Sequence, residues 1–417
     1  MEQFENAIVY LIMACAAVSV AISIFNKEHP LGKKFFEGLD TIGTIFLPVA
    51  AILASIPFLK GLCVGVFGAF FSFLGADPAL AATTIIATDM GGYELAAAVA
   101  ETKESWMMAM IVGYMGGATI VFSIPLALRI LHEDDRKYLA LGIISGIIAI
   151  PVGVLASCLL LALRQPLIRE AVGKHLTAGY ELSLSFLLVF RNLLPLILLS
   201  AVLLILLKKK PDLLIKAFLI FGRIVDIALR VIFLLAMAEY STGFFSAVIG
   251  HWGFDPIMAD TENLYRAAET ACSIGIILAG AFPFVYILQT YLKKPLAKIG
   301  RFCRLSVRAI AGILAASANV IALFGIIREL SPEDKIICLA YSVCAAFLIG
   351  DHMLFTDMYQ PSMALPIMAG KLVGGCFGIF IAMKIAVPIA KAMAKTELLR
   401  EGDSLYKQRQ RDISRRS

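Results

Sequence analysis

Apolar runs long enough to cross a lipid bilayer recur from one end of the chain to the other. A transmembrane helix needs about 20 predominantly apolar residues. Such runs lie near 6–25, 38–59, 105–131, 138–164, 181–207, 212–238, 266–292, 335–355 and 362–389. Only 16% of the 417 residues are charged, whereas soluble domains carry about 25%. The sequence therefore predicts an all-α polytopic membrane protein with about 9–13 transmembrane helices and excludes a soluble catalytic domain.

Two regions, 60–101 and 293–330, contain short apolar pieces that polar residues interrupt. Neither has the composition of one regular span, so we expect two discontinuous segments. The chain accordingly divides into five parts. They are an N-terminal span and linker (1–37), a first transmembrane repeat (38–164), intervening spans with an external loop (165–265), a second repeat (266–390) and a basic cytoplasmic tail (391–417).

Basic residues gather in a few connections, and this distribution predicts the orientation of the chain. Cytoplasmic loops of membrane proteins are enriched in Lys and Arg. The connection 293–308, the run Lys208 to Lys210 and the tail 391–417 are strongly basic, whereas 240–264 holds Asp255, Asp260 and Glu262 without Lys or Arg. We expect the first three inside and the last outside. This topology requires 293–330 to enter and leave on one side, and it places the basic connection 164–180 outside, against the rule.

The net charge of +6 is explained by these loops and does not imply a nucleic-acid partner. The eight cysteines form neither a CxxC pair nor a zinc spacing, so we expect packing thiols, no metal and no cofactor. The first apolar run follows Glu2 and Glu5 instead of basic residues, which indicates a first span and no signal peptide.

The two broken segments resemble each other. ALAATTIIATDMGGYELAAA (79–98) and AIAGILAASANVIALFGII (309–327) both begin with small residues, and each places one polar residue, Asp89 or Asn319, at its eleventh position. Upstream, ILASIPF (52–58) resembles ILAGAFPF (277–284). The order span, short piece, broken piece, span, span recurs in both halves, and the predicted topology gives the halves opposite directions. We therefore predict an inverted repeat, an architecture that many secondary transporters share.

Asp89 is the ionisable residue of the first broken segment. Placing a charged side chain at the centre of a bilayer helix costs about 2.5–3.5 kcal/mol on insertion scales. Non-helical backbone such as Gly91-Gly92 is tolerated at that depth only inside protein or beside a watery cavity. Asp89 is therefore predicted to bind a cation at a helix break formed by Gly91 and Gly92. The structural alternative is that it pairs with Arg191 or caps a half-helix.

A second polar cluster, CAAFLIGDHMLFTDM (344–358), places Asp351 and His352 inside the predicted span 335–355. An adjacent Asp-His pair at membrane depth is a candidate proton or substrate site, and Gly350 is expected to permit close helix contact. In the first half, Thr119 and Ser123 occupy the matching place and offer hydroxyl groups, although such residues also line ordinary helix contacts.

The remaining charges within spans have structural interpretations. Asp226 and Arg230 are four residues apart and are expected to pair on one helix face. Glu269 and Lys371 are expected near span ends, where long side chains reach the interface.

Several motifs together resemble one known family. They are GADPALAATTIIATDMGG (75–92), GGATIVFSIPLAL (116–128), DDRKYLALGIISGIIAIPVG (134–153), ASANVIALFG (316–325) and GDH (350–352). In this order, over about 40–390, they resemble the EutH family, the ethanolamine permeases of bacterial ethanolamine-utilisation systems. Relatives often carry two consecutive Asn and then Pro where this chain has Asn319, Val320 and Ala322.

The resemblance implies a multi-pass protein of the bacterial inner membrane that admits ethanolamine for a cobalamin-dependent ammonia-lyase. Ethanolamine is a small ammonium with one hydroxyl group. The residues expected to bind it are Asp89, Asn319 and Asp351, with Ser123, Thr119 or His352 at the hydroxyl end. Uniport and coupling to a proton or sodium ion both remain open, and the number of subunits is not readable. The alternatives are a carrier for another small amine or a nucleobase and, in a different class, an intramembrane aspartyl enzyme that uses Asp89 and Asp351.

Overall fold

A computed structural model describes residues 2–173, 176–250, 253–254, 256–257, 267–291 and 293–395 of the chain. The acidic residues Asp255, Asp260 and Glu262 and the tail beyond 395 lie outside this set. The outside position expected for 240–264 and most of the predicted basic tail are therefore not described.

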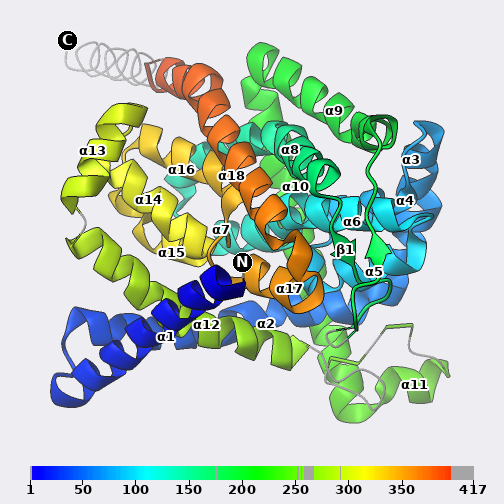
Figure 1. Cartoon of the computed structure of the whole chain (residues 1–417), viewed down its shortest axis with the longest axis horizontal. Helices are drawn as coiled ribbons and strands as arrows, with labels where there is room; N and C mark the ends of the chain where they lie inside the picture. Colours follow the sequence, from blue (N-terminus) through cyan, green and yellow to red (C-terminus); the bar gives the residue numbers. More distant parts are fainter. Residues whose placement is uncertain are drawn as a thin grey trace, which may run out of the picture.

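The described chain is helical apart from one short pair of strands. Its α-helices are α1 (Glu2–Phe25), α2 (Pro30–Leu62), α3 (Ala69–Phe73), α4 (Pro78–Ile85), α5 (Gly92–Val99), α6 (Lys103–Val112), α7 (Ile124–Ile130), α8 (Arg136–Arg164), α9 (Phe186–Lys209), α10 (Pro211–Thr242), α11 (Phe244–Ile249), α12 (Ala267–Tyr291), α13 (Lys293–Cys303), α14 (Val307–Ala318), α15 (Val320–Ile326), α16 (Pro332–Ala345), α17 (Asp351–Tyr359) and α18 (Ala364–Ile381). Figure 1 shows their arrangement. The prediction of an all-α protein is confirmed.

Six helical stretches among the described residues are long and apolar enough to cross a membrane. They are Pro30–Ser55, Lys103–Ile130, Glu133–Arg164, Phe186–Lys209, Ala267–Ile287 and Pro361–Lys395. The predicted span 335–355 is wrong, because α16 ends at Ala345 and α17 begins at Asp351. The predicted span 212–238 corresponds to the single helix α10, whose charged residues keep it outside the six.

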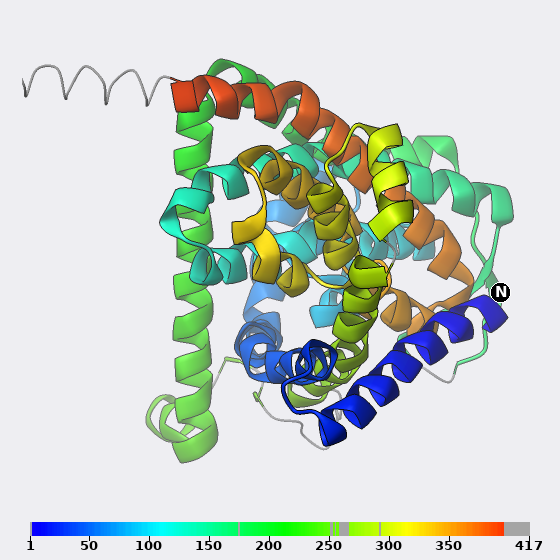
Figure 2. The ribbon, with the colours of Figure 1, turned by 90° about the vertical axis from the view of Figure 1, so that its left-hand side faces the viewer.

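Helix α10 lies along the edge of the molecule. It is the long straight helix that Figure 2 shows at one side, with α11 at its end. Most of its residues are exposed, and Asp226 pairs with Arg230 at 2.6 Å across one helical turn. The predicted Asp226–Arg230 pair is confirmed, and it satisfies two charges on this exposed helix.

Glycines bring three central helices into backbone contact. A side-chain carbon on Gly142 or Gly146 of α8 would lie 2.9 or 2.5 Å from a carbonyl oxygen of α16, and one on Gly370 of α18 would lie 2.6 Å from the Gly153 oxygen of α8. Small residues permit this close packing of helices in a membrane. Helices α8, α16 and α18 therefore form a tight centre to which the discontinuous segments attach.

The two halves of the chain contain the same order of elements. In the first half α2 is followed by a short piece with α3, the broken pair α4–α5, the helix of α6 and α7, and α8. In the second half α12 is followed by α13, the broken pair α14–α15, the pair α16–α17, and α18. This order agrees with the predicted one except that the broken pair α16–α17 stands in place of the predicted span 335–355. The inverted symmetry of the halves stays a prediction.

Each broken pair is a hairpin whose two ends meet. Asp77 caps α4 by accepting a hydrogen bond from the Ala79 amide, and its second oxygen accepts one from the Glu101 amide, just after α5, at 2.9 Å. In the second hairpin, Arg308 at the start of α14 donates to the Glu329 carbonyl, after α15, at 3.3 Å. The two ends of the second hairpin therefore lie together, and the prediction that 293–330 enters and leaves the membrane on one side stays a prediction.

The bases of the hairpins lie at opposite ends of α8. Asp135, directly before α8, pairs at 2.5 Å with Lys335 in the first turn of α16, close to the base of the second hairpin. At the other end, Lys103 beside the first base donates to the carbonyl of Glu170, which follows α8. Helix α8 has 29 residues and is therefore about 43 Å long. Figure 1 accordingly shows α4 and α5 on one side of the molecule and α14 and α15 on the other.

A short two-stranded hairpin follows α8 at the end that adjoins the first base. Its strands β1 (Leu167–Ile168) and β2 (Tyr180–Glu181) pair antiparallel. The Tyr180 hydroxyl donates to Glu104 at 2.8 Å and ties this hairpin to the start of α6. This connection is the basic segment that the topology placed outside.

Candidate functional site

Asp89 lies at the tip of the first hairpin. A single 3₁₀ turn, Thr88–Met90, separates α4 from α5, and Gly91 follows it with φ of 91°. This left-handed conformation is one that glycine adopts without steric cost. A side-chain carbon on Gly92 would lie 2.5 Å from the Ala87 oxygen, so the chain closes on itself there. The glycine pair therefore reverses the chain directly after Asp89.

The tip rests on two glycines one turn apart in the helix of α6 and the π-helical segment Gly113–Ser123. A side-chain carbon on Gly117 would lie 2.3 Å from the Ile86 oxygen, and one on Gly113 would lie 2.3 Å from the Thr88 hydroxyl. That hydroxyl donates to the Met110 carbonyl at 2.7 Å. Close backbone approach and one side-chain hydrogen bond thus fix the break that carries Asp89.

Asn319 lies at the tip of the second hairpin. Its backbone is extended, and its side-chain oxygen caps α15 by accepting from the Ile321 amide at 2.8 Å. The amide group of the same side chain donates to Asp351 at 3.5 Å. Asn319, which matches Asp89 when the two broken segments are compared, therefore contacts the second polar cluster (344–358).

The second cluster lies in a further helix break, between α16 and α17. The amides of Phe347 and Ile349 donate at 3.2 and 2.9 Å to the carbonyls of Ala316 and Ser317 at the end of α14, which would otherwise be unpaired. Phe347 has φ of 60°, which costs about 1–3 kcal/mol for a residue with a side chain. Gly350 lies against the Ala318 oxygen, so its role is contact with a hairpin tip.

Asp351 and His352 occupy the first turn of α17, and His352 faces the first hairpin. Its Nε2 atom lies 3.8 Å from Oδ1 of Asp89. Its ring packs between Tyr114 and Phe347, with centroids 4.6 and 4.8 Å away. Among the described residues, Oδ1 of Asp89 and Oδ1 of Asp351 are buried without a hydrogen-bond partner. Buried polar groups are normally paired, so two carboxylate oxygens without partners indicate a site for a ligand.

Lys371 completes this cluster, contrary to its predicted position near a span end. It is fully buried in α18, and its ammonium lies 2.9 Å from Nδ1 of His352 and 3.2 Å from the Tyr114 carbonyl oxygen. When Lys371 is an ammonium, which only donates, Nδ1 of His352 accepts and the neutral ring carries its proton on Nε2, toward Asp89. We call Asp89, Asn319, Asp351, His352 and Lys371 the polar cluster.

Thr119 and Ser123 lie in the π-helical segment with both side chains buried. The Thr119 hydroxyl donates to carbonyls of Met115 and Val343 at 3.0 and 3.4 Å, and the Ser123 hydroxyl donates to the Ala118 carbonyl at 3.3 Å. Within the part of the chain that the structure describes, neither hydroxyl bonds a member of the polar cluster. Their assignment to the substrate stays a prediction.

Asp89 does not pair with Arg191, and α5 begins after Gly91 without a side-chain cap. The Arg191 guanidinium donates to the Gly75 carbonyl at 3.0 Å and holds the turn before α4. Glu269, the other charge expected near a span end, is exposed.

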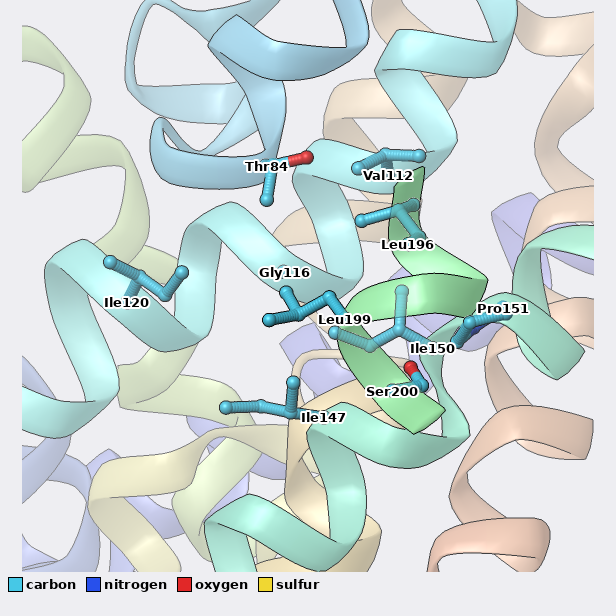
Figure 3. A pocket seen from close by; sticks show the side chains of 10 residues that line it. All are labelled: Thr84, Val112, Gly116, Ile120, Ile147, Ile150, Pro151, Leu196, Leu199 and Ser200. Atoms are coloured by element: carbon cyan, nitrogen blue, oxygen red, sulfur yellow. The ribbon is translucent and has the colours of Figure 1, made fainter. Parts of the chain in front are cut away.

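A cavity of about 560 Å³ is lined by residues of α2, α12 and the second hairpin. Its lining includes the exposed acids Glu37, Asp40 and Glu329 and, from the second hairpin, the buried Ala315 and the half-buried Ile321, which lie before and after Asn319 in the chain. A second cavity, of about 30 Å³, lies between α4, α8 and α9 (Figure 3). Its lining is apolar apart from Thr84 and Ser200. This volume is close to that of one water molecule, so the small cavity is no substrate site.

Gln360 directly follows α17, at the opposite end of that helix from Asp351, and is fully buried. Its amide group donates to the Tyr93 hydroxyl at 2.8 Å and to the Arg169 carbonyl at 3.0 Å, and its oxygen accepts from the Arg169 amide at 2.9 Å. The Arg169 guanidinium donates to the carbonyls of Met358 and Tyr359 at the end of α17, at 2.6 and 3.1 Å. The Arg169 guanidinium thus binds carbonyls at the C-terminal end of α17, where a cation is favourable. This contact gives a structural reason for a basic residue in the connection 164–180.

Comparison with known proteins gives a consistent set of relatives. The sequence model of one family, described as "Ethanolamine utilisation protein, EutH", matches residues 4–385. A probable ethanolamine permease EutH of Listeria monocytogenes is 33% identical over 383 residues, which cover 92% of this chain and 94% of the relative. The probable ethanolamine permease EutH of Salmonella typhimurium is 33% identical over 376 residues, 88% of either chain. An uncharacterised Bacillus subtilis protein, YxeR, is 30% identical over 372 residues, 89% of this chain and 92% of its own. No solved structure matches.

Proposed function

Because this chain belongs to the EutH family of ethanolamine utilisation proteins, we propose that it carries ethanolamine, in its ammonium form, across the bacterial inner membrane. Its relatives are named probable ethanolamine permeases, and the chain has six candidate spans among its described residues. Membership favours a carrier over the alternative of an intramembrane aspartyl enzyme.

The observation that carries this proposal is the pair of unpartnered carboxylate oxygens where helix breaks meet. Asp89 and Asp351 each have a buried oxygen that bonds nothing among the described residues, and His352 and Asn319 lie beside them, at 3.8 Å from Asp89 and 3.5 Å from Asp351. Buried charges persist only with partners. An ammonium with three N–H donors would supply partners to both oxygens. Asn319 and His352 lie beside the two acids and are proposed to orient the substrate.

The different surroundings of the polar cluster on its two sides support an alternating-access mechanism. The cavity at the second hairpin would admit a cation past Glu37, Asp40 and Glu329, whereas Gln360 and Arg169 would close the opposite side. The Lys391–Glu333 pair, at 2.8 Å, sets the start of the basic tail beside α16 and hence beside the second base. By the positive-inside rule, we propose that this side is cytoplasmic and that the structure is open inward.

Energetics permit transport without a coupled ion. An entering cation gains about 2.3 kcal/mol per 100 mV of membrane potential, which corresponds to about fiftyfold accumulation. Ethanolamine has four non-hydrogen atoms, and at a ceiling of about −1.5 kcal/mol per atom its binding does not exceed roughly −6 kcal/mol. We therefore propose uniport through a weak site, with dissociation constants no lower than tens of micromolar.

The test is a flux measurement with purified protein in proteoliposomes. At mildly acidic pH, where the membrane-permeable free amine is scarce, labelled ethanolamine should enter protein-containing vesicles with saturable kinetics, faster with an inside-negative potential. Entry that is equal with and without protein would refute the solute assignment. Dependence on a proton or sodium gradient at fixed potential would refute uniport and keep the carrier.

A further inference from the structure

Lys371 is a buried cation held away from the acids that it neutralises. Its side chain is fully buried, and its ammonium contacts a ring nitrogen of His352 and the carbonyl oxygen of Tyr114. Among the described residues, no carboxylate lies within salt-bridge distance of it. His352 stands between Lys371 and Asp89 and contacts Lys371 with one ring nitrogen while the other faces the carboxylate. The space beside the carboxylate oxygens is therefore not filled by the lysine.

The charge count of the polar cluster matches one small cation. When both acids are ionised and Lys371 is protonated, Asp89, Asp351 and Lys371 together carry one net negative charge. In a buried site, any excess or deficit of charge is costly because water does not screen it. A ligand with a single ammonium group brings this site to neutrality, and a ligand with two such groups leaves it positive.

We propose that Lys371 is a specificity-determining residue whose charge restricts the site to monovalent amines and rejects diamines. The inference rests on the proposed function, because it concerns the same carboxylates and the same class of substrate. It adds a residue that does not touch the substrate and acts through the charge that it contributes.

A purely structural role for Lys371 makes a different prediction. Its two hydrogen bonds join α18 to α17 and to the helix of α6, so removing them would lower stability or uptake of every amine alike. The ratio of two amines that share the site would then stay constant. The discriminating quantity is therefore the ratio of inhibition constants for 1,3-diaminopropane, a dication at the assay pH, and for unlabelled ethanolamine.

The experiment measures both constants against labelled ethanolamine in proteoliposomes that contain the full-length protein. Lys371→Met should lower the diamine-to-ethanolamine ratio at least about tenfold, which corresponds to about 1.4 kcal/mol. Lys371→Arg keeps the charge and should leave the ratio within about twofold, below half a kcal/mol. A Lys371→Met ratio equal to that of the unmodified protein would overturn the proposal.

A second comparison tests the proposal even if Lys371→Met alone does not fold. Asp351→Asn alone leaves the cluster without a net charge and should weaken ethanolamine inhibition at least about tenfold. Combining Asp351→Asn with Lys371→Met restores one net negative charge and should recover most of that loss. Failure of the double variant to bind ethanolamine better than Asp351→Asn would overturn the proposal. If the unmodified protein moves no ethanolamine, the proposed function itself has failed, a result distinct from an unchanged ratio.

Discussion

His352 turns the N–H edge of its ring toward Asp89, with 3.8 Å between Nε2 and the nearer carboxylate oxygen. This separation exceeds that of a hydrogen bond, so the oxygen remains available to another donor. Lys371 holds the ring from its other side, and the lysine bond fixes the proton on the edge that faces the acid. A carboxylate at one hairpin tip and a ring after the other break are thus brought together from distant parts of the chain.

Asp89→Asn should eliminate saturable ethanolamine uptake. Hydrogen bonds to charged groups contribute about 1.5–3 kcal/mol, so losing the charge should weaken the apparent affinity for ethanolamine about tenfold to a hundredfold. Because the site is already weak, uptake by the variant should then no longer saturate at the ethanolamine concentrations of the assay. The measurement is uptake at mildly acidic pH with the amount of inserted protein determined. Asp226→Asn is the matched control. It removes a carboxylate paired with Arg230 on the exposed helix α10 and should change uptake less than about twofold.

Gly117→Ala should displace the tip of the first hairpin and lower uptake. The added carbon would lie 2.3 Å from the Ile86 oxygen, a backbone atom that cannot move without shifting the turn that carries Asp89. Overpacking of this kind costs about 1–3 kcal/mol. Gly43→Ala in α2, where nothing lies within 4 Å of the added carbon, is the control and should match the unmodified protein in thermal stability and uptake. Equal behaviour of the two variants would contradict this account of the tip.

The polar cluster shows how far the sequence predicted the site. Asp89, Asn319, Asp351 and His352 could be found because each is a polar residue inside an apolar run, which is costly in lipid and hence conspicuous. The glycine pair after Asp89 likewise signals a break. Thr119 and Ser123 carried a weaker signal, since hydroxyls in membrane helices usually bond their own backbone, as these do.

Lys371 and the break before Asp351 could not be placed from the sequence. Lysine near a span boundary usually extends to the interface, and nothing local shows that His352 lies within 2.9 Å of it. The segment 346–350 contains no proline and one glycine, so its apolar composition predicted a continuous helix. It is unwound because amides of Phe347 and Ile349 pair with the end of α14, a tertiary interaction that periodicity does not encode.

Asp135→Asn should destabilise the fold at the start of α8. The Asp135–Lys335 pair is buried, with both side chains 10% exposed and 2.5 Å between the charged atoms. Removing one partner of a buried pair typically costs about 3–5 kcal/mol, because the other charge is left unpaired. The unfolding temperature in detergent should fall accordingly. Asp135→Leu combined with Lys335→Met should recover at least half of the loss, and a double variant less stable than Asp135→Asn would contradict this explanation.

Gln360→Leu should loosen the contact between the hairpin that follows α8 and the end of α17. The change leaves the Arg169 amide and carbonyl and the Tyr93 hydroxyl without the partners that they have now. Each unsatisfied buried group costs about 1–3 kcal/mol, so local opening should become at least about tenfold more frequent. Hydrogen exchange reports this directly, because the Arg169 amide bonds to the replaced side chain. In the variant that amide should exchange at least about tenfold faster. The Leu182 amide, which bonds to the Pro166 carbonyl in the same hairpin at 3.0 Å, should be unaffected.

The same two amides test whether this contact opens during transport. If ethanolamine must pass Gln360, saturating ethanolamine should increase exchange at Arg169 in the unmodified protein and leave Leu182 unchanged. Asp89→Asn should abolish that response, because a carrier that does not bind substrate is not driven through its cycle. Faster exchange at both amides would indicate that the whole hairpin unfolds. An Arg169 amide indifferent to Gln360→Leu would show that the glutamine does not hold the two segments together.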